Sequence, residues 1–285
     1  MAAIIHFPDF MFNNMDLKPG KIRKCFYFFY GIIVGIIHKN TNGKLFCFFM
    51  NLFFNKENKI FFEEGLYCKK IQNEKICYPN KRIDRIIIDY KKHLSHFLES
   101  YCLDDFEIQD NDTVLDCGAN VGELYFALKQ NKYNFEYIAF EPDPVTYNCL
   151  KKNIKNTTSK TYKGALSEKS GFAKFFIDSE GGDSSLVYFG KDTTINVKTY
   201  SLDSLKLERV KLFKVEAEGY EYEVLCGAKN TLSKIQYITV DYGPEKGIAK
   251  ETSKADVTNF LYENGFTMIK GSKFRHIALF KNINF

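Results

Sequence analysis

From about residue 97 onward, short apolar runs alternate with stretches in which apolar residues recur at helical spacing. Strands are expected at about 113–117, 137–140, 161–166, 172–177, 197–202, 212–218, 237–242, 266–269 and 276–280. Helices are expected between them at about 122–130, 144–156, 220–233 and 254–264. This alternation is typical of an α/β fold in which a mostly parallel sheet carries helices on both faces. The last two strands are close in sequence, which favours an antiparallel hairpin at one edge.

Residues 1–62 have a different pattern, rich in Phe and only weakly periodic. They contain 13 of the 28 Phe, and eight basic against three acidic side chains give them a net charge of +5. The rest of the 285 residues balance at 32 basic against 32 acidic. Because the basic charge is confined to one end, nucleic acid is not expected as a partner. We expect two domains, a Phe-rich, basic, helical extension or cap over 1–95 and an α/β domain over 96–285.

The most apolar stretch of the extension, 25–37, follows the basic residues Lys21, Arg23 and Lys24. Its 13 residues are fewer than the about 20 that a membrane-spanning helix needs. The polar residues after it do not provide the small-residue cleavage site of a signal peptide. We therefore interpret this stretch as a buried or interfacial element.

The eight cysteines form no CxxC pair and no cluster with His at zinc-binding spacing, which argues against a structural zinc site. Several lie inside apolar runs, as small buried hydrophobic residues do. We interpret them as reduced thiols of a cytoplasmic protein. A bridge between Cys68 and Cys77 is conceivable, but nothing in the sequence requires it.

The sharpest local signal is the loop Asp116-Cys117-Gly118-Ala119-Asn120-Val121-Gly122, where the first strand of the α/β domain turns into its first helix. Glycines here permit a tight turn and a close approach of the backbone to a ligand. A dinucleotide fingerprint needs glycine at 118, 120 and 123, but positions 120 and 123 are Asn and Glu. Because Glu123 would repel a pyrophosphate at the helix N-terminus, a ligand without phosphates fits better.

Glu141 ends the second strand, 23 residues after Gly118. A carboxylate at that place can accept hydrogen bonds from both hydroxyls of a ribose. A phosphate-free adenosine joined to an amino-acid portion describes S-adenosylmethionine, and Asp116 can accept from the amino group of the methionine portion. The alternative is a glycine-capped turn between strand and helix, with a surface Glu.

A second unusual segment is Lys214-Val215-Glu216-Ala217-Glu218-Gly219-Tyr220-Glu221. In a strand, Lys214, Glu216 and Glu218 point to one face, so an apparently central strand carries charge. Because burying unpaired charge is costly, we expect the carboxyl end of this strand to reach a ligand cleft, with Glu218 nearest to it. The alternative is an ion-paired edge strand in which Lys214 neutralises a neighbour.

These motifs together resemble the FkbM family of S-adenosylmethionine-dependent methyltransferases. The resemblance rests on five segments in family order, at 114–122, 140–144, 164–167, 199–205 and 213–228. It implies a Rossmann-like class I methyltransferase sheet of seven strands and the methylation of hydroxyl groups, often on sugars of polysaccharides, glycolipids or polyketide-type products. Glu216 departs from the Asp that is usual in the family, and Cys117 departs from a commoner Val. Residues 1–95 lie outside the resemblance.

The expected site follows from the same motifs. The residues expected to bind S-adenosylmethionine are Asp116, Gly118, Ala119, Asn120, Gly122, Glu141, Pro142, Gly164 and Ala165, with the last two beside the adenine. For the base that takes the proton of the acceptor, Glu218 is the first candidate, Asp241 the second and His276 the third. No metal is expected, and in the alternative Glu216, Glu218 and Asp241 hold Mg²⁺ or Ca²⁺.

The expected acceptor is a sugar hydroxyl of a polysaccharide, glycolipid or related glycan, which Asp183, Ser184, Ser185 and Tyr188 suit by their polar and aromatic groups. The alternatives are methylation of a nitrogen or a small metabolite, and non-catalytic binding of S-adenosylmethionine. Residues 1–62 are interpreted as a cap that buries Phe against the sheet edge or, in a homo-oligomer, a second subunit. The alternative for 1–62 is peripheral docking on the anionic inner face of a membrane.

Overall fold

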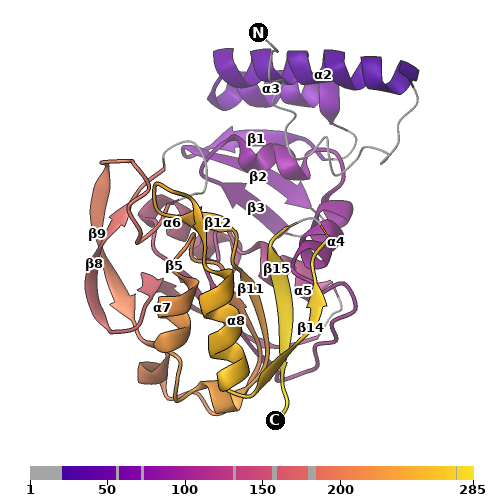
Figure 1. Ribbon diagram of the computed structural model, residues 1–285. Helices are drawn as coiled ribbons and strands as arrows, with labels where there is room; N and C mark the ends of the chain where they lie inside the picture. Colours follow the sequence, from indigo (N-terminus) through magenta and orange to yellow (C-terminus); the bar gives the residue numbers. More distant parts are fainter. Residues whose placement is uncertain are drawn as a thin grey trace. The chain divides into compact units, whose positions relative to one another are not determined.

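The computed structural model describes residues 21–55, 58–71, 74–130, 133–155, 159–178, 184–273 and 275–285, and side chains from residue 26 onward. The chain divides into two compact units, Met1–His96 and Phe97–Phe285. The boundary falls inside one helix, α4 (Tyr90–Ser100) (Figure 1).

The first unit contains two apolar helices and a small antiparallel sheet. The helices are α2 (Lys21–Asn40) and α3 (Gly43–Phe54), the strands are β1 (Ile60–Glu63), β2 (Leu66–Ile71) and β3 (Glu74–Tyr78), and the 3₁₀ helix η1 (Lys81–Ile86) precedes α4. The expectation of a helical extension is therefore wrong for the β1–β3 segment. The charged residues of β2 obscured the strand. Lys69 is nevertheless buried, because its Nζ donates to the carbonyls of Ile86 and Ile87 at 2.7 and 3.0 Å.

Two cysteines of this sheet are opposite one another. Cys68 on β2 and Cys77 on β3 are register partners, and they form a disulfide. The sequence left this bridge open, and the interpretation of all eight cysteines as free thiols is wrong for this pair. Cys47, Cys102, Cys117, Cys149 and Cys226 are free.

The second unit is built on a seven-stranded sheet in the order β14-β15-β11-β10-β4-β5-β6. Its strands are β4 (Thr113–Cys117), β5 (Glu136–Glu141), β6 (Lys160–Lys163), β10 (Val210–Val215), β11 (Ile235–Asp241), β14 (Phe266–Gly271) and β15 (Ile277–Asn282). The run from β6 to β11 is parallel, whereas β15 is antiparallel to both β11 and β14. The predicted Rossmann-like α/β fold, with seven strands and an antiparallel edge hairpin, is confirmed.

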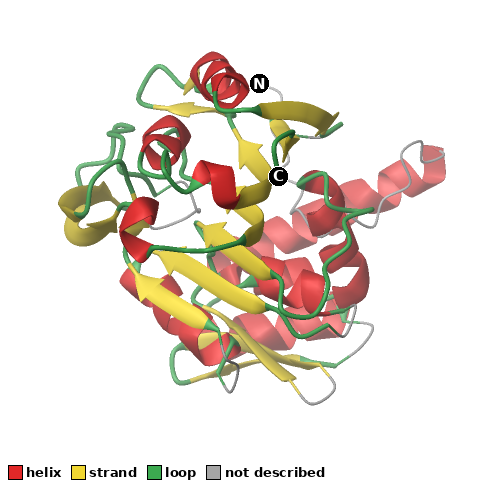
Figure 2. Ribbon diagram, turned by 90° about the horizontal axis from the view of Figure 1, so that it is seen from below, coloured by secondary structure: helices red, strands yellow, loops and turns green. Residues whose placement is uncertain are grey.

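Helices pack on both faces of this sheet. They are α5 (Glu123–Lys129), α6 (Pro144–Asn153), α7 (Glu221–Cys226) and α8 (Lys254–Glu263). In Figure 1, α7 and α8 lie together in front of the sheet and α5 lies behind it. Val224 and Leu225 of α7, with Val257 and Leu261 of α8, belong to the apolar core formed with the strands. Figure 2 shows the strands as a yellow layer with red helices beside it.

The start of α6 shows how the sequence determines an element locally. The side chain of Asp143 accepts a hydrogen bond from the backbone N–H of Thr146 at 2.7 Å, and Pro144 occupies the first turn. The cap satisfies an amide that has no partner inside the helix, and proline there removes no intrahelical bond. The predicted start of this helix is therefore correct.

One predicted strand is divided between two sheets. The expected strand 161–166 breaks at Gly164, where an added Cβ would overlap the carbonyl oxygen of Lys198. The chain before the break is β6. After it, β7 (Ala165–Leu166) pairs with β9 (Thr194–Tyr200), which also pairs with β8 (Gly171–Phe176). The close backbone approach at Gly164 therefore diverts the chain out of the large sheet.

Several short elements connect these strands. They are η2 (Leu202–Leu205), η3 (Leu232–Lys234), β12 (Pro244–Lys246) and β13 (Glu251–Thr252). The expected helix 220–233 is shorter than predicted, and α7 covers only Glu221–Cys226. Gly227 follows it, and an added Cβ at Gly227 would overlap the backbone of Ser167.

Candidate functional site

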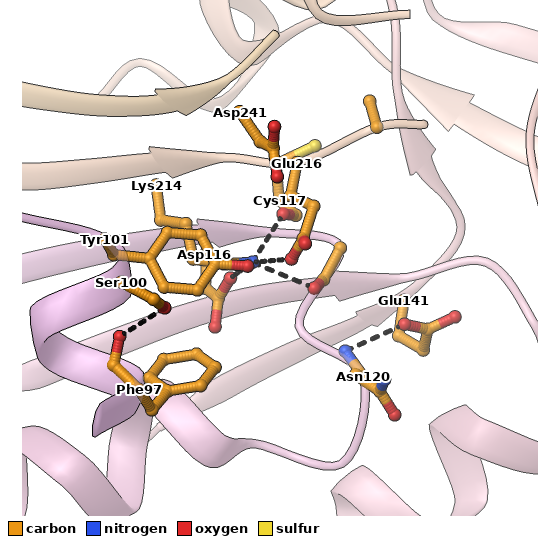
Figure 3. A network of polar contacts seen from close by, with 12 residues as sticks. Phe97, Ser100, Tyr101, Asp116, Cys117, Asn120, Glu141, Lys214, Glu216 and Asp241 are labelled. Carbon is orange, nitrogen blue, oxygen red and sulfur yellow. Dashed lines mark hydrogen bonds and ion pairs between the residues drawn. The ribbon is translucent and has the colours of Figure 1, made fainter. Parts of the chain in front are cut away.

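Two central strands bring a cation and a carboxylate together inside the sheet. Lys214 on β10 and Asp116 on β4 are register partners, and their side chains are only 2% and 1% exposed. The Nζ of Lys214 donates to Oδ1 of Asp116 at 2.9 Å and to the carbonyls of Cys117 and Gly118 at 3.2 and 3.0 Å (Figure 3). Lys214 therefore holds the end of β10 against the loop that follows β4.

The same network continues to the end of β11. Glu216 Oε2 lies 3.0 Å from Lys214 Nζ, and Glu216 Oε1 accepts from Arg275 Nη2 at 2.9 Å. The same nitrogen of Arg275 donates to Oδ2 of Asp241 at 2.5 Å. Three carboxylates, counting Asp116, thus share two cations, which leaves the network with one net negative charge.

Two tyrosines complete the network. Tyr137 donates its hydroxyl hydrogen to Oδ2 of Asp116 at 2.5 Å. The ring of Tyr101 lies beneath both cations, with its centroid 5.2 Å from Lys214 Nζ and 5.3 Å from the Arg275 guanidinium carbon. Burial raises the pKa of both tyrosines, and the neighbouring carboxylates raise it further, so both hydroxyls stay protonated.

The charges of the network depend on one another. Burial alone would lower the pKa of Lys214, but the charges of Asp116 and Glu216 outweigh burial and raise that pKa. Burial acts to raise the pKa of Glu216, yet Lys214 and Arg275 hold it well below its usual range. In both cases opposite charges at hydrogen-bond distance overcome the cost of desolvation. Removing one member therefore exposes the others to that cost.

The glycine-containing loop after β4 uses its own amide groups. The N–H groups of Gly118 and Ala119 both donate to the carbonyl of Phe140, at 3.1 and 3.0 Å, and that of Gly122 donates to Ala119 at 2.8 Å. Gly118 has a left-handed φ of 70°, and an added Cβ would overlap the carbonyl oxygen of Glu216. These three amides are therefore not available to bind a phosphate.

Glu141 connects this loop to the next one. Its Oε2 accepts from the N–H of Asn120 at 2.9 Å (Figure 3). Its Oε1 accepts from the N–H of Asp143 at 2.9 Å. Burial raises the pKa of Glu141 to about 8. Its backbone carbonyl accepts from the N–H of Gly164 at 3.1 Å. Four of the predicted positions, Gly118, Asn120, Glu141 and Gly164, thus meet at the carboxyl edge of β4, β5 and β6, with Pro142 and Ala165 adjacent in the chain.

Glu218 lies in a turn and not in the strand. β10 ends at Val215, and Glu218 and Gly219 have left-handed φ values of 50° and 92°. The prediction that Glu218 shares a strand face with Lys214 is therefore wrong. Glu221 stabilises this turn, because its carboxylate accepts from the N–H groups of Ala217 and Gly219 at 3.1 and 2.9 Å and from Ser253 Oγ at 2.7 Å.

The turn places Glu218 beside a carboxyl group that the sequence reasoning missed. Glu245, on β12, interacts with Glu218, and this interaction acts to lower the pKa of Glu245. Burial raises the pKa of Glu245 to about 7, and the negative charges of Asp241 and Glu216 contribute. The buried Oε2 of Glu245 has no hydrogen-bond partner among the described residues. A carboxyl group that titrates near neutral pH is suited to accept a proton.

The other two candidate bases differ in their surroundings. Asp241 ends β11 and is buried, with Arg275 on one oxygen and the N–H of Gly243 on the other at 3.1 Å. His276 precedes β15, its side chain is exposed, and its backbone carbonyl accepts from the N–H of Tyr242 at 3.0 Å. At the carboxyl edge of the sheet, Asp241 is the last residue of β11, Glu218 follows β10 and His276 precedes β15.

The alternative metal site is not assembled. In the part of the chain that the structure describes, no three His, Cys, Asp or Glu side chains are grouped so that they could hold a metal ion. Arg275 lies between Glu216 and Asp241, so a cationic side chain already occupies the space between those two carboxylates. Asp183, expected to contact an acceptor, lies outside the described residues.

Comparisons with known proteins show which family the chain resembles. The model of the family described as "Methyltransferase FkbM domain" matches residues 116–268, more than half of the chain. A hexuronic acid methyltransferase, AglP, of Haloferax volcanii is 28% identical over 163 residues, which are 55% of this chain and 64% of that protein. The 2-O-methyltransferase NoeI of Sinorhizobium fredii is 24% identical over 155 residues, 47% of this chain and 64% of that protein.

Methyltransferase sdnD of Sordaria araneosa is 27% identical over 166 residues, 45% of this chain and 64% of that protein. The chain thus spans just under two thirds of the length of each of these relatives. A crystal structure of Methyltransferase FkbM from Methylobacillus flagellatus superposes with a TM-score of 0.47 at 15% identity, covering 67% of this chain and 50% of that one. On the family match, which includes the loop after β4, Glu141 and the whole Lys214 segment, the chain belongs to the FkbM methyltransferase domain family.

Proposed function

We propose that this protein transfers the methyl group of S-adenosylmethionine to a hydroxyl oxygen of a sugar in a polysaccharide, glycolipid or related glycan. The observation that carries the proposal is the net negative network of Asp116, Lys214, Glu216, Arg275 and Asp241 at the carboxyl edge of the sheet, in which the side chains of Asp116, Lys214 and Asp241 are buried. Ligands of open parallel sheets bind at that edge, and a negative site favours a cationic ligand. Membership of the FkbM family supports the same reaction.

The residues at this edge fit such a cofactor. In its ionised form Glu141 accepts one backbone hydrogen bond on each oxygen and keeps a lone pair on each, which suits a pair of ribose hydroxyls. The amides of Gly118, Ala119 and Gly122 are used within the protein, so the loop favours a nucleoside without phosphates. Gly164 and Ala165 would lie beside the adenine. When bound, S-adenosylmethionine supplies an electrophilic methyl group on a positively charged sulfur.

The proposed role of the protein is to orient the acceptor and to take its proton. As the O–CH₃ bond forms and the S–CH₃ bond breaks, the hydroxyl proton passes to a carboxylate. Glu218 is the proposed acceptor of this proton, and its interaction with Glu245 would allow the two carboxyl groups to share it. Asp241 is less suited, because both of its oxygens already accept hydrogen bonds from the protein. Alignment and proton transfer together account for much of the expected rate.

The sugar acceptor is inferred from the relatives and from chemistry. The names of two relatives specify a hexuronic acid substrate and 2-O-methylation. A sugar hydroxyl is a weak acid, so its methylation needs a nearby proton acceptor, and the Glu218–Glu245 pair meets that need. A glycan that carries a hexuronic acid is therefore the first acceptor to test.

The test incubates the purified chain with methyl-labelled S-adenosylmethionine and two oligosaccharides that differ only in a hexuronic acid or its neutral counterpart. We expect S-adenosylhomocysteine to form and the intact mass of an oligosaccharide to rise by one methyl group. Glu218→Gln should lower turnover by about 10²–10⁴-fold while S-adenosylmethionine binding, measured by calorimetry, stays unchanged. Glu251→Gln, which changes an exposed carboxylate on β13, serves as the matched control.

Three outcomes would contradict the proposal. Methylation confined to amines would assign the chain to nitrogen acceptors, and binding of S-adenosylmethionine without turnover on any glycan would indicate a binding protein. Full turnover in Glu218→Gln would remove Glu218 from the reaction and leave the methyl transfer itself intact.

A further inference from the structure

Helix α3 is apolar on both of its sides. Phe46, Cys47, Met50 and Phe54 are buried within the first unit. On the opposite side, at the helical spacing i, i+3 and i+7, Leu45, Phe48 and Leu52 are exposed by 53%, 60% and 64%. A surface helix of a globular protein normally carries polar residues on its outer side. The outer side of α3 therefore lacks the composition of a surface that faces water.

Helix α2 repeats this arrangement. Val34 and Ile37 are buried, while Phe29, Ile32 and Ile36, again at i, i+3 and i+7, are exposed. The two helices contact one another in the first unit. We name these exposed side chains the apolar face, which consists of Phe29, Ile32 and Ile36 of α2 and Leu45, Phe48 and Leu52 of α3. Exposed apolar residues scattered singly need no explanation, but two stripes on adjoining helices indicate an interaction surface.

The formally charged residues of the two helices that carry the apolar face are all basic. The sequence has no acidic residue between Asp16 and Glu57, whereas it has Lys21, Arg23, Lys24, Lys39 and Lys44 in the two helices. Lys39 and Lys44 are exposed at the connection between α2 and α3. An apolar face on two helices that carry basic and no acidic residues is complementary to a surface that is apolar inside and negative outside. A bilayer with anionic lipids has that composition.

We propose that the apolar face of α2 and α3 docks on an anionic lipid bilayer and lies within its interface. Among the described residues no helix is both long and apolar enough to cross a membrane, which agrees with helices that lie in the interface plane. A second copy of the chain is a poorer occupant, because a self-complementary contact would bring the basic residues of both copies together. This proposal does not depend on the proposed methyl transfer.

The test mixes the full chain with vesicles of phosphatidylcholine and phosphatidylglycerol, or of phosphatidylcholine alone, and measures flotation. We expect flotation with the anionic vesicles and a decrease in it at high salt. The triple variant Leu45→Ser, Phe48→Ser, Leu52→Ser keeps the buried side of α3 and should bind at least about tenfold more weakly, because three apolar side chains no longer leave water. The double variant Lys39→Glu, Lys44→Glu should lose the preference for anionic vesicles.

Matched controls come from the second unit. Phe172→Ser removes a Phe that is 73% exposed on β8, and Lys281→Glu reverses an exposed charge on β15, so both should float like the unchanged chain. Circular dichroism checks that each variant is folded. Failure of the unchanged chain to float overturns the proposal, and so does equal flotation of the triple variant.

Two specific results would identify another occupant. A dimer in solution that the triple variant converts to a monomer, without flotation of either, would assign the apolar face to a second copy. Flotation that appears only after removal of residues 1–20 would assign it to that segment of the chain. Either result overturns docking of the full chain on lipid. Flotation needs neither cofactor nor acceptor, so its failure is distinct from a failure of the methyl-transfer proposal.

Discussion

The ammonium group of Lys214 and the carboxylate of Asp116 are 2.9 Å apart, buried between the two strands at the centre of the sheet. Neither group could be buried alone without a cost of several kcal/mol. The pair therefore depends on both members, and Lys214 extends that dependence to Glu216 through a second contact of 3.0 Å. The carboxyl edge of the sheet is thus held in shape by charge as well as by apolar packing.

Lys214→Met should destabilise the second unit by about 3–5 kcal/mol, because it leaves the buried Asp116 and Glu216 without their shared cation. The measurement is urea unfolding. Because the chain contains no Trp, unfolding is followed by far-ultraviolet circular dichroism and tyrosine fluorescence. Lys281→Met, at an exposed position on β15, is the control and should change stability by less than about 0.5 kcal/mol. Adding Asp116→Asn to Lys214→Met should recover part of the loss, and a purely additive double variant would contradict the pairing.

Gly118→Ala should destabilise the loop after β4 by more than the cost of placing an alanine in a left-handed conformation. The left-handed conformation costs a residue with a Cβ about 1–2 kcal/mol, and at Gly118 the Cβ would also overlap the carbonyl of Glu216. Gly190 has a φ of 91° with open space around it, so Gly190→Ala measures the conformational cost without the overlap. We expect Gly118→Ala to unfold at lower urea and to bind S-adenosylmethionine more weakly than Gly190→Ala. Equal effects of the two substitutions would show that the close approach is unimportant.

The sheet and its helices could be predicted because their signals are local. Apolar runs of strand length indicated β4 and β5, and Asp143 with Pro144 indicated the start of α6. The break at Gly164 and the turn at Glu218 could not be found this way. Both depend on backbone that approaches from another segment, Lys198 in the first case and Lys246 against Gly219 in the second. At such positions the apolar and polar pattern in the sequence still predicts a strand, although the strand in the structure has ended.

The candidate site was only partly predictable for a related reason. The pairing of Lys214 with Asp116 had a signal, since two opposite charges in neighbouring buried strands can be brought into register. Arg275, Tyr101 and Glu245 had none, because each lies in a connection or in the short strand β12, and the sequence there shows no unusual composition. Their roles follow from the antiparallel pairing of β15 with β11, which brings Arg275 to Asp241, and from the placement of β12 beside the turn at Glu218.

Arg275→Gln should make the protein less stable at neutral pH. The difference in stability between the variant and the unchanged protein should become smaller as the pH falls. Arg275 helps to hold the pKa of Glu216 below its ordinary value of 4.5, against the effect of burial. A lowered pKa contributes stability that is present above 4.5 and is lost as the pH falls toward the folded-state value. We expect a loss of about 1–2 kcal/mol at pH 7, between the values for exposed and buried pairs because the Arg275 side chain is partly exposed.

Urea unfolding of both proteins from neutral to acidic pH measures this difference. Arg275→Lys is the informative companion, because a lysine keeps the charge but is a single point donor, and should recover only part of the stability. A stability difference that stays constant from neutral pH to well below 4.5 would indicate that Arg275 acts through packing and not through the pKa of Glu216.

Glu245→Gln should remove a pH dependence of both stability and turnover. Burial, with the charges of Asp241 and Glu216, raises the pKa of Glu245 from 4.5 to about 7. Between these values the folded protein holds a proton that the unfolded chain has released, so stability falls as the pH rises through this window. Glu245→Gln lacks that slope and should gain stability relative to the unchanged protein as the pH rises from about 5 to about 7.

If Glu218 and Glu245 share the acceptor's proton, turnover of the unchanged protein should also rise with an apparent pKa near 7, which belongs to the pair. Urea midpoints and initial rates across this range measure both effects, with Glu251→Gln as the exposed control. Parallel stability curves for Glu245→Gln and the unchanged protein would contradict the raised pKa, and an unchanged pH–rate profile in Glu245→Gln would exclude Glu245 from proton transfer.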